Sequence, residues 1–331
     1  MTKNILIFRC DRIGDLLLSC PSIKSIKESS PDTELTVVTS EKNFSYAKTL
    51  KFFDKVYLFP KKNILKKIIF IKELRKIKYD KIFIYDGKER SIISTFFLNA
   101  NIKVGLITKH KLYYNLSKIK FFLDNDENDI HKIFHEFLKF TKNNNNITNF
   151  NFLTLKPDNK FASNLNIKNY LHIHLDEKWF SQKYISHYTD INPSFNQFTS
   201  FLDRVSSMYN VLITTGLTDL DLIERLKNEY FNKRKKNIFY KKLNNLIYLV
   251  DKPSFEDLES MLRNTEILIA CHGAITHASN SFNIKKIDII EEKKEKHYNR
   301  LTSYLSNYCI VYRSEFKKIE RNLSKIIFSK F

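Results

Sequence analysis

Glycine and proline are scarce in this sequence, with five and six residues among 331. The few glycines form neither a GxGxxG nor a GxxxxGK[ST] pattern, which excludes the dinucleotide-binding fingerprint and the P-loop. The four cysteines include no CxxC pair, so nothing indicates a zinc site or a disulfide scaffold. We interpret Cys10 and Cys20 as small buried apolar residues.

Long apolar runs are also missing, because no stretch reaches the roughly 18 residues that a membrane-spanning helix needs. The short apolar stretch at the N-terminus is interrupted by Arg9, Asp11, Arg12 and Asp15, and no small-residue cleavage site is evident. We therefore expect no signal peptide and no transmembrane helix, and we expect the protein to stay in the cytoplasm.

Acidic residues are few relative to basic ones: 36 Asp and Glu oppose 56 Lys and Arg, which gives a net charge of +20. A charge of this size favours anionic partners, namely nucleic acid, an anionic membrane surface or phosphorylated substrates. Lys, Ile, Asn and Phe are all abundant, so codon bias in an AT-rich genome also explains part of the excess. No zinc-finger or RNP-type motif points to specific nucleic-acid binding.

One basic stretch, PKKNILKKIIFIKELRKIKYDK at 60–81, interleaves lysines with apolar residues at helical spacing. This pattern predicts an amphipathic helix with a cationic outer face. Such a face is suited to the headgroups of anionic lipids, which would place the protein peripherally on the inner face of the inner membrane.

Short apolar strands alternate with amphipathic helix patterns in both halves of the chain, which predicts parallel sheets covered on both faces. In the first half we expect strands at 4–8, 34–39, 55–59, 80–85 and 102–106. Helices are expected there at 14–29, 42–51, 63–77, 88–98 and 129–141. In the second half we expect strands at 170–174, 210–214, 246–249, 266–270, 286–290 and 308–312. The helices of that half are expected at 195–208, 219–230, 254–263, 274–282 and 314–328.

An Asn-rich polar stretch separates the two halves, and we interpret 142–156 as a linker. The sequence therefore predicts two α/β domains, at 1–150 and 151–331, that face each other across a cleft. The last helix is a candidate to pack back on the first domain.

The first candidate site is the sequence DRIGD, Asp11 to Asp15, between the first strand and the first helix. Gly14 permits a tight turn or the close approach of a ligand. A carboxylate at Asp15 would be stabilised by the helix dipole by roughly 0.3–1 kcal/mol. One interpretation is that Asp11 or Asp15 only caps the helix; the other is that Asp15 is a general base that takes a proton from an attacking hydroxyl.

The second candidate site is HLDEKW, where a strand ends in Asp176-Glu177-Lys178-Trp179. Lys178, just past the strand end, can meet a phosphate as a mobile point charge, or it is simply an exposed lysine. His172 and His174 have strand spacing and point to one face, but no third ligand for a metal is identifiable. The DND sequence of Asp124 to Asp126 is read as a solvated turn rather than a metal site.

The third candidate site is TEILIACHGAITHASNSF at 265–282. A buried strand ends at Cys271, and a glycine turn then leads into a helix of small residues. Free N–H groups and the helix dipole make such a turn a phosphate-binding arrangement. The residues assigned to it are His272, Gly273, Ala274, Thr276 and His277.

These three segments together resemble the family-9 glycosyltransferases, the lipopolysaccharide heptosyltransferases, over nearly the full length of the chain. The opening ILIFRCDRIGDLLLSCPSIKSIKESSPD is similar to the family's strand and D-x-x-G-D-type loop. HLDEKW looks like its middle motif, and VLITTGLTDLDLIERL, with Thr215 and Gly216, looks like the strand-glycine-helix unit that follows. The block IYLVDKPSFEDLESMLRNTEILIACHGAITHAS is similar to the late segment with its D-S-G-x-x-H-type loop.

The resemblance implies a GT-B fold of two Rossmann-like domains, the first binding the acceptor and the second a nucleotide sugar. It implies inverting transfer without a metal or other cofactor. It assigns the catalytic base to Asp15, the acceptor-side loop to Asp11, Arg12 and Gly14, and phosphate binding to Lys178. His174 and the loop His272 to His277 fall on the donor side.

One difference from the family is His272, which stands where an aspartate is usual, and the GP usually found after the next strand is replaced by IDIIEEKKEKHYN. ADP-heptose is the family's best-known donor, and another nucleotide sugar remains an alternative. The acceptor implied is a lipopolysaccharide, with an O-antigen or capsule glycan as the alternative. A different class altogether is a non-catalytic basic module that binds nucleic acid or membrane.

Overall fold

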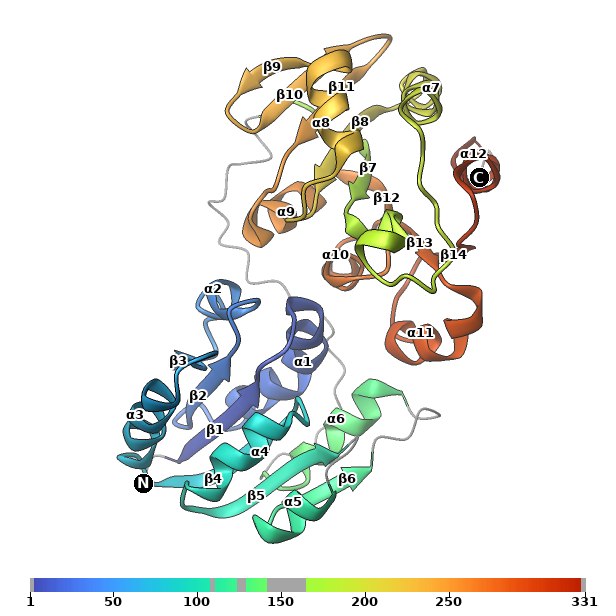
Figure 1. The fold of residues 1–331 in the computed structure, drawn as a ribbon. Helices are drawn as coiled ribbons and strands as arrows, with labels where there is room; N and C mark the ends of the chain where they lie inside the picture. The colour runs from blue at the N-terminus through green and yellow to red at the C-terminus, as the bar shows by residue number, and fades with distance from the viewer. Residues whose placement is uncertain (1–2, 108–110, 124–128, 142–164, 329–331) are drawn as a thin grey trace. The chain divides into compact units, whose positions relative to one another are not determined.

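The structure, a computed structural model, describes residues 3–107, 111–123, 129–141 and 165–328. The chain forms two compact α/β units, Met1–Thr154 and Leu155–Phe331, which we call unit 1 and unit 2 (Figure 1). The expected linker at 142–156 and the DND sequence lie outside the described residues.

Unit 1 contains a six-stranded parallel sheet in the order β3-β2-β1-β4-β5-β6. Its strands are β1 (Asn4–Arg9), β2 (Glu34–Thr39), β3 (Lys55–Leu58), β4 (Tyr79–Ile84), β5 (Ala100–Ile107) and β6 (Lys120–Leu123). Its helices are α1 (Ile13–Ser29), α2 (Phe44–Ala47), α3 (Ile64–Arg75), α4 (Glu89–Phe96), α5 (Lys111–Leu116) and α6 (Ile130–Leu138). The direction of winding reverses between β1 and β4, which lie side by side at the centre.

Helices cover both faces of this sheet. One face packs against α3, α4 and α5, whose buried residues share a cluster with alternate strand residues: Leu6, Phe8, Phe70, Leu74, Ile82, Ile84, Ile92 and Tyr114. The opposite set of strand residues meets α6, where the Tyr85 ring stacks on Phe137 with centroids 4.0 Å apart. Ser22 of α1 hydrogen-bonds to the same tyrosine and to the backbone of α6. The period-2 strands and helical apolar stripes therefore build the expected layers.

Unit 2 contains an eight-stranded sheet in the order β14-β13-β12-β7-β8-β11-β10-β9, parallel except for β10. Its strands are β7 (Tyr170–Leu175), β8 (Asn210–Thr215), β9 (Asn232–Lys235), β10 (Ile238–Lys242), β11 (Leu246–Val250), β12 (Thr265–Cys271), β13 (Lys285–Ile290) and β14 (Tyr308–Tyr312). Its α-helices are α7 (Phe195–Val205), α8 (Asp221–Arg225), α9 (Phe255–Leu262), α10 (Ala274–Ala278), α11 (Glu295–Thr302) and α12 (Phe316–Phe328). Here the winding reverses between β7 and β12.

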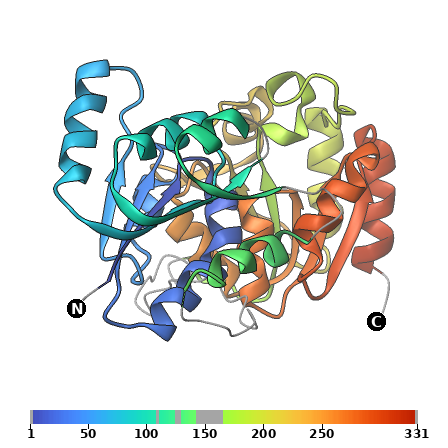
Figure 2. The same ribbon diagram turned by 90° about the horizontal axis from the view of Figure 1, so that it is seen from below.

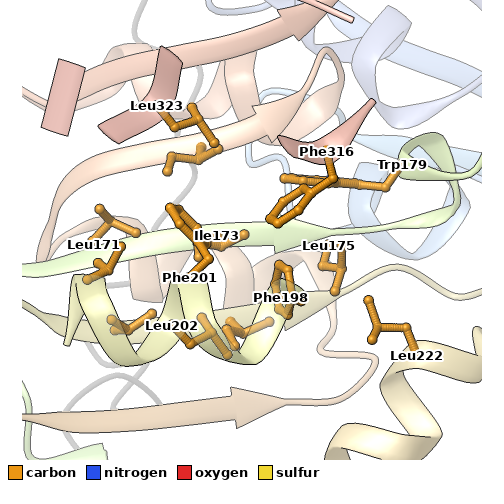
Figure 3. Packing of buried hydrophobic residues seen from close by; sticks show 14 of the residues in the cluster. Leu171, Ile173, Leu175, Trp179, Phe198, Phe201, Leu202, Leu222, Phe316 and Leu323 are labelled. Atoms are coloured by element: carbon orange, nitrogen blue, oxygen red, sulfur yellow. The ribbon is translucent and has the colours of Figure 1, made fainter. Parts of the chain in front are cut away.

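The main core of unit 2 lies between this sheet and the helices α7, α8 and α12. Trp179 is fully buried there, with Phe198 and Phe316 around its ring (Figure 3). Its indole Nε1 donates a hydrogen bond to the backbone oxygen of His174 at 2.9 Å. The apolar face of α12 also belongs to this core, and its packing on unit 1 stays a prediction.

Trp179→Phe is expected to lower the free energy of unfolding by about 2–3 kcal/mol. The smaller ring leaves a void in a fully packed site, and the buried His174 carbonyl loses its donor. Urea unfolding followed by circular dichroism measures the change. An unchanged midpoint would show that the indole hydrogen bond and its packing contribute nothing to stability.

Several elements differ from the sequence-based expectation. The β9–β10 hairpin, the α5–β6 pair and α11 are not predicted by the alternation, because β9 is wholly exposed and polar, α5 and β6 have only six and four residues, and α11 buries no apolar residue. The tight turn considered at Gly14 is not formed, because Gly14 is the second residue of α1. A glycine with a positive φ occurs instead at Gly87, with φ 54°. Cys10 and Cys20 are buried, as predicted.

The helix expected at 63–77 forms as α3, but it does not present a purely cationic outer face. Only Phe70 and Leu74 are buried in it, whereas Ile64, Leu65, Ile68 and Ile69 are exposed. The apolar residues of this stretch outnumber the positions that the sheet can cover. Across the described ranges, no helix combines the length and apolarity needed to cross a bilayer.

Candidate active site

The loop DRIGD lies where the winding of the unit 1 sheet reverses. It follows β1, and the loop that begins at Asp86 follows the neighbouring β4. Adjacent strands whose connections leave in opposite directions open a crevice at their carboxyl ends, where α/β proteins bind ligands. Both loops line one cavity of about 410 Å³.

Side chains from two neighbouring segments, 40–43 and 86–90, hold the start of the DRIGD segment in place. Asn43 Nδ2 donates to the backbone oxygen of Arg9 at 2.8 Å, and Ser40 Oγ donates to that of Asp11 at 2.6 Å. Asp86 accepts from the backbone N–H of Cys10 at 2.8 Å, and Arg90 donates to the oxygen of the same cysteine. The loop is therefore built to a fixed shape before any ligand binds.

Asp15 is the third residue of α1 and is half-buried at the wall of this cavity. Its Oδ2 accepts the backbone N–H of Arg12 at 3.2 Å, so it does cap the helix. Its backbone oxygen accepts from the buried Arg9 guanidinium at 2.9 Å. Capping and exposure to the cavity occur together, and the two interpretations of Asp15 do not exclude each other.

Asp11 faces the same cavity in a more buried setting. Its Oδ2 pairs with Arg9 at 3.1 Å, while its Oδ1 is buried and has no hydrogen-bond partner among the described residues. Burial raises the pKa of Asp11 to about 7, partly offset by Arg9 and reinforced by the negative charges of Asp15 and Asp86. Near neutral pH, the carboxyl group of Asp11 is therefore partly protonated, next to Asp15.

The stability of the protein is expected to reflect this raised pKa. The folded state holds the Asp11 proton more tightly than the unfolded chain, so stability decreases as the pH rises through about 7. We compare the unfolding free energy of Asp11→Asn with that of the original chain at two pH values. The difference is expected to move in favour of the variant by ~2 kcal/mol from pH 5 to pH 8. Urea unfolding at both pH values measures this, with the exposed Asp32→Asn as control. Equal shifts for the two variants would contradict the assignment.

The walls of the cavity are more basic than acidic. The lining includes the acidic residues Asp11, Asp15 and Glu41 and the basic residues Arg12, Lys42, Lys61, Lys88 and Arg90. A second cavity of about 280 Å³, in unit 2, contains none of the predicted site residues in its lining.

In unit 2, Lys178 lies where the winding of that sheet reverses, between the carboxyl ends of β7 and β12. Its Nζ pairs with Asp176 Oδ2 at 2.7 Å and donates to the backbone oxygens of His272 at 3.1 Å and Cys271 at 3.3 Å. Burial lowers the pKa of Lys178, but the charge and hydrogen bond of Asp176 raise it further, so the net shift is upward. The ammonium is therefore charged and joins the second candidate site to the third.

Two glycines make room for this arrangement. A Cβ on Gly273 would collide with Lys178 Nζ, and one on Gly216 would lie 2.8 Å from the Cβ of Asp176. Gly273 itself has extended backbone, with φ 178°. Close approach to the Asp176 Cβ explains the glycine at position 216, whereas a side chain at position 273 would displace the flexible Lys178 ammonium from its contacts.

The two histidines of β7 lie beneath the Lys178 loop and are neutral. Burial lowers the pKa of His174 to about 3 and that of His172 well below its usual value. Both rings hydrogen-bond to Thr214 Oγ1, at 2.9 and 2.8 Å. His174 Nε2 is also 3.6 Å from Asp176 Oδ2, so the neutral ring lies beside the carboxylate that holds Lys178 without a hydrogen bond to it. Within the described ranges, no group of three or more His, Cys, Asp or Glu has a metal-binding arrangement.

The turn after β12 is organised by Asp288, a carboxylate that lies in the neighbouring strand β13. It accepts from His272 Nδ1 at 2.7 Å, Thr276 Oγ1 at 3.1 Å and the Tyr308 hydroxyl at 2.9 Å. His277 is buried, hydrogen-bonds to Tyr304 and lies edge-on to the His272 ring. Ala274 begins α10 at the end of this turn.

The structure thus brings Lys178, Asp176, His272, Gly273 and Gly216 together. Thr215 is tied to Asp251 by a 2.8 Å hydrogen bond at the end of β8. The sequence-based assignment gives no role to Asp288, Asp176, Asp86, Arg9 and Arg90. A charged residue inside an apolar strand, as in KKIDII, is the available signal for Asp288, and an aspartate one or two residues past a strand end is the signal for Asp176 and Asp86.

Solved structures similar to this chain include two classes of enzyme. The glycosyl transferase family 9 protein from Veillonella parvula matches with a TM-score of 0.68 and 13% identity, covering 99% of this chain and 90% of that one. The E. coli heptosyltransferase WaaC with ADP has a TM-score of 0.70 and 12% identity, covering 97% and 99%. The UDP-GlcNAc 2-epimerase of Methanocaldococcus jannaschii has a TM-score of 0.58 and 12% identity, covering 100% and 93%.

No protein-family model and no curated protein matches the sequence. The structural likenesses confirm the predicted fold class, two Rossmann-like α/β domains of the GT-B type. At 9–13% identity for the glycosyltransferases, they confirm the resemblance at the level of the fold. The epimerase match means that the fold alone does not select the reaction.

Proposed function

We propose that the chain is an inverting, metal-independent glycosyltransferase that uses a nucleoside-diphosphate sugar. The donor sugar is a heptose or a related sugar. The acceptor is a lipopolysaccharide or another surface glycan at the cytoplasmic face of the inner membrane. The observation that carries the proposal is the charged Lys178 ammonium, held at the β7–β12 switch point against the Gly273 turn.

The donor binds to unit 2 in this proposal. An ammonium beside backbone N–H groups is suited to a diphosphate, because both stabilise anionic oxygens. A phosphate oxygen would take over one of the three contacts of Lys178, and Asp176 would keep the ammonium in place. His174, Thr215, Gly216, Thr276 and His277 support the loops around this position.

The acceptor binds to the unit 1 cavity, where Asp11 and Arg12 form the loop beside the base and Gly14 lies in the first turn of α1. Asp15 takes the proton of an acceptor hydroxyl group while the oxygen of that hydroxyl attacks the anomeric carbon of the donor. The bond between that carbon and the diphosphate oxygen breaks, and its electron pair leaves with the nucleoside diphosphate. A single displacement of this kind inverts the anomeric configuration.

The negative charge that develops on the leaving diphosphate is stabilised by Lys178 and by the N–H groups near Gly273 and Ala274. These groups take the part that a divalent cation plays in other transferases, which is why we propose transfer without a metal. His272 distinguishes this chain from the family it resembles, and its bond to Asp288 fixes the orientation of its ring. A donor other than ADP-heptose is therefore a specific alternative.

The proposal is tested by incubating the protein with nucleotide sugars, selected by a thermal-shift screen, and a glycan acceptor in the presence of EDTA. We expect an acceptor-dependent release of nucleoside diphosphate and a product of inverted configuration. Loss of transfer in EDTA would contradict the metal-free mechanism. Conversion of the sugar nucleotide without an acceptor would instead indicate epimerase chemistry.

A non-catalytic basic module makes a different prediction. It would bind generic DNA tightly with a steep dependence on salt and would bind no nucleotide sugar. A gel shift at several salt concentrations, run beside the thermal-shift screen, separates the two classes.

A further inference from the structure

The outer surface of α3 in unit 1 combines exposed aliphatic side chains with lysines. Ile64 is 73% exposed, Leu65 69%, Ile68 47% and Ile69 58%. We call these four residues the α3 apolar stripe. An exposed cluster of large aliphatic side chains costs free energy in water and marks an interaction site.

The local fold gives this stripe a definite direction. Asn63 caps the helix by accepting the Lys66 N–H at 3.2 Å, and Phe70 and Leu74 anchor it in the sheet. At 100° per residue, the four stripe residues fall within roughly 140° on the side opposite the anchors. The stripe therefore points away from the sheet of unit 1; α3 is labelled in Figure 1 and is the blue helix at the left of Figure 2.

The charge around the stripe has one sign. The segment 61–72 contains five lysines and no acidic residue. The next acidic residue, Glu73, pairs with Lys76 at 2.7 Å. Among the ion pairs of the described residues, Lys61 is the one lysine of the five with an acidic partner, an exposed contact with Glu41 at 3.3 Å.

Exposed apolar residues continue on the neighbouring helices. Phe96 and Phe97, at the end of α4, are 59% and 52% exposed, and Leu112 and Leu116 of α5 are 68% and 61% exposed. Because α3, α4 and α5 bury residues in the same cluster, the three helices cover the same face of the unit 1 sheet. Exposed apolar residues therefore occur on all three helices of this side of unit 1.

We propose that this side of unit 1 is a membrane-docking surface, in which the α3 apolar stripe inserts between the headgroups of an anionic bilayer and the flanking lysines bind lipid phosphates. Aliphatic insertion with lysines around it is the arrangement of interfacial helices. Lysine stems reach past an inserted apolar face to the phosphates. The surface deepens the proposed function, because it holds the protein at the membrane that carries a glycolipid acceptor.

A second copy of the chain fits this surface less well. A symmetric dimer through α3 would bring the same patch of unbalanced lysines face to face, and it would have to overcome their repulsion. A bilayer with anionic lipids supplies both the apolar layer and the opposite charge.

Flotation with vesicles tests the proposal, using the full chain and pure lipids without acceptor or nucleotide. We expect binding to vesicles of phosphatidylcholine and phosphatidylglycerol and little binding to phosphatidylcholine alone. Ile64→Ser with Leu65→Ser, or Lys62→Glu with Lys66→Glu, is expected to reduce the bound fraction at least about fivefold. The matched controls, Met208→Ser and Lys233→Glu with Lys235→Glu, change exposed residues of unit 2 and are expected to bind as the original chain does.

Equal binding by the α3 variants and the controls would overturn the proposal. Analytical ultracentrifugation gives a second outcome that would overturn it. If the original chain formed a dimer and only the variant with Ile64→Ser and Leu65→Ser did not, the stripe would be the contact with a second copy. Transfer to a soluble, lipid-free acceptor is expected to be unchanged in the α3 variants. If the docking proposal is wrong, transfer to the soluble acceptor is still observed. If the proposed transferase function is wrong, binding to anionic vesicles is still observed.

Discussion

Asp15→Asn is expected to lower the rate of sugar transfer at least about 100-fold, because it removes the base that accepts the hydroxyl proton. The asparagine oxygen can still accept the Arg12 N–H, so the cap of α1 and the fold are retained. Nucleotide binding is expected to be unchanged, since the donor contacts lie in unit 2. Initial rates with saturating donor and acceptor measure the loss.

The neighbouring carboxylate provides the control for this experiment. Asp11→Asn keeps Asp15 and removes only the carboxyl that pairs with Arg9. Its transfer rate is expected to decrease far less than that of Asp15→Asn. If Asp15→Asn retained the original rate while Asp11→Asn lost it, Asp11 would be the base and Asp15 only a cap.

Lys178→Met is expected to weaken nucleoside-diphosphate binding at least tenfold and to lower the transfer rate about 10²–10³-fold. The ammonium is the cation that meets the leaving diphosphate, and stabilisation of charge in the transition state is worth this much in other active sites. A thermal-shift titration with nucleoside diphosphate measures binding, and initial rates measure transfer.

Two controls separate this effect from a loss of folding. Lys178→Met leaves the buried Asp176 without its ion pair, so a decrease in stability is expected as well. Lys178→Arg keeps the charge and tests whether binding follows charge rather than stability. Lys168→Met changes an exposed lysine just before β7 and is expected to behave as the original chain. Original affinity in a folded Lys178→Met variant would exclude a donor role for Lys178.

The sequence predicts the two sheets well because each buried strand is a short apolar run followed by a turn signal. The loops DRIGD, HLDEKW and HGAITH were placed correctly at strand ends for the same reason. Periodicity does not show which strand ends are neighbours. The contact between Lys178 and the Gly273 turn depends on β7 pairing with β12, which are about 90 residues apart.

Other features depend on burial that no local pattern reveals. The lysine-rich stretch of α3 has a helical pattern, but this pattern does not show that its aliphatic residues remain exposed to solvent. Their exposure is seen only in the structure, where α3 follows the edge strand β3. The raised pKa of Asp11 results from the burial of its carboxyl group, reinforced by the negative charges of Asp15 and Asp86. The spacing of His172 and His174 places both on one face of the strand, but it does not show that His174 is buried beneath the Lys178 loop.

A calorimetric titration of the full chain with nucleoside diphosphates in the presence of EDTA tests the donor site most directly. We expect the original chain and Asp15→Asn to bind without a divalent cation, and Lys178→Met to bind at least tenfold more weakly. No binding of any nucleoside diphosphate, or equal binding by the original chain and Lys178→Met, would contradict the assignment of the donor site to unit 2.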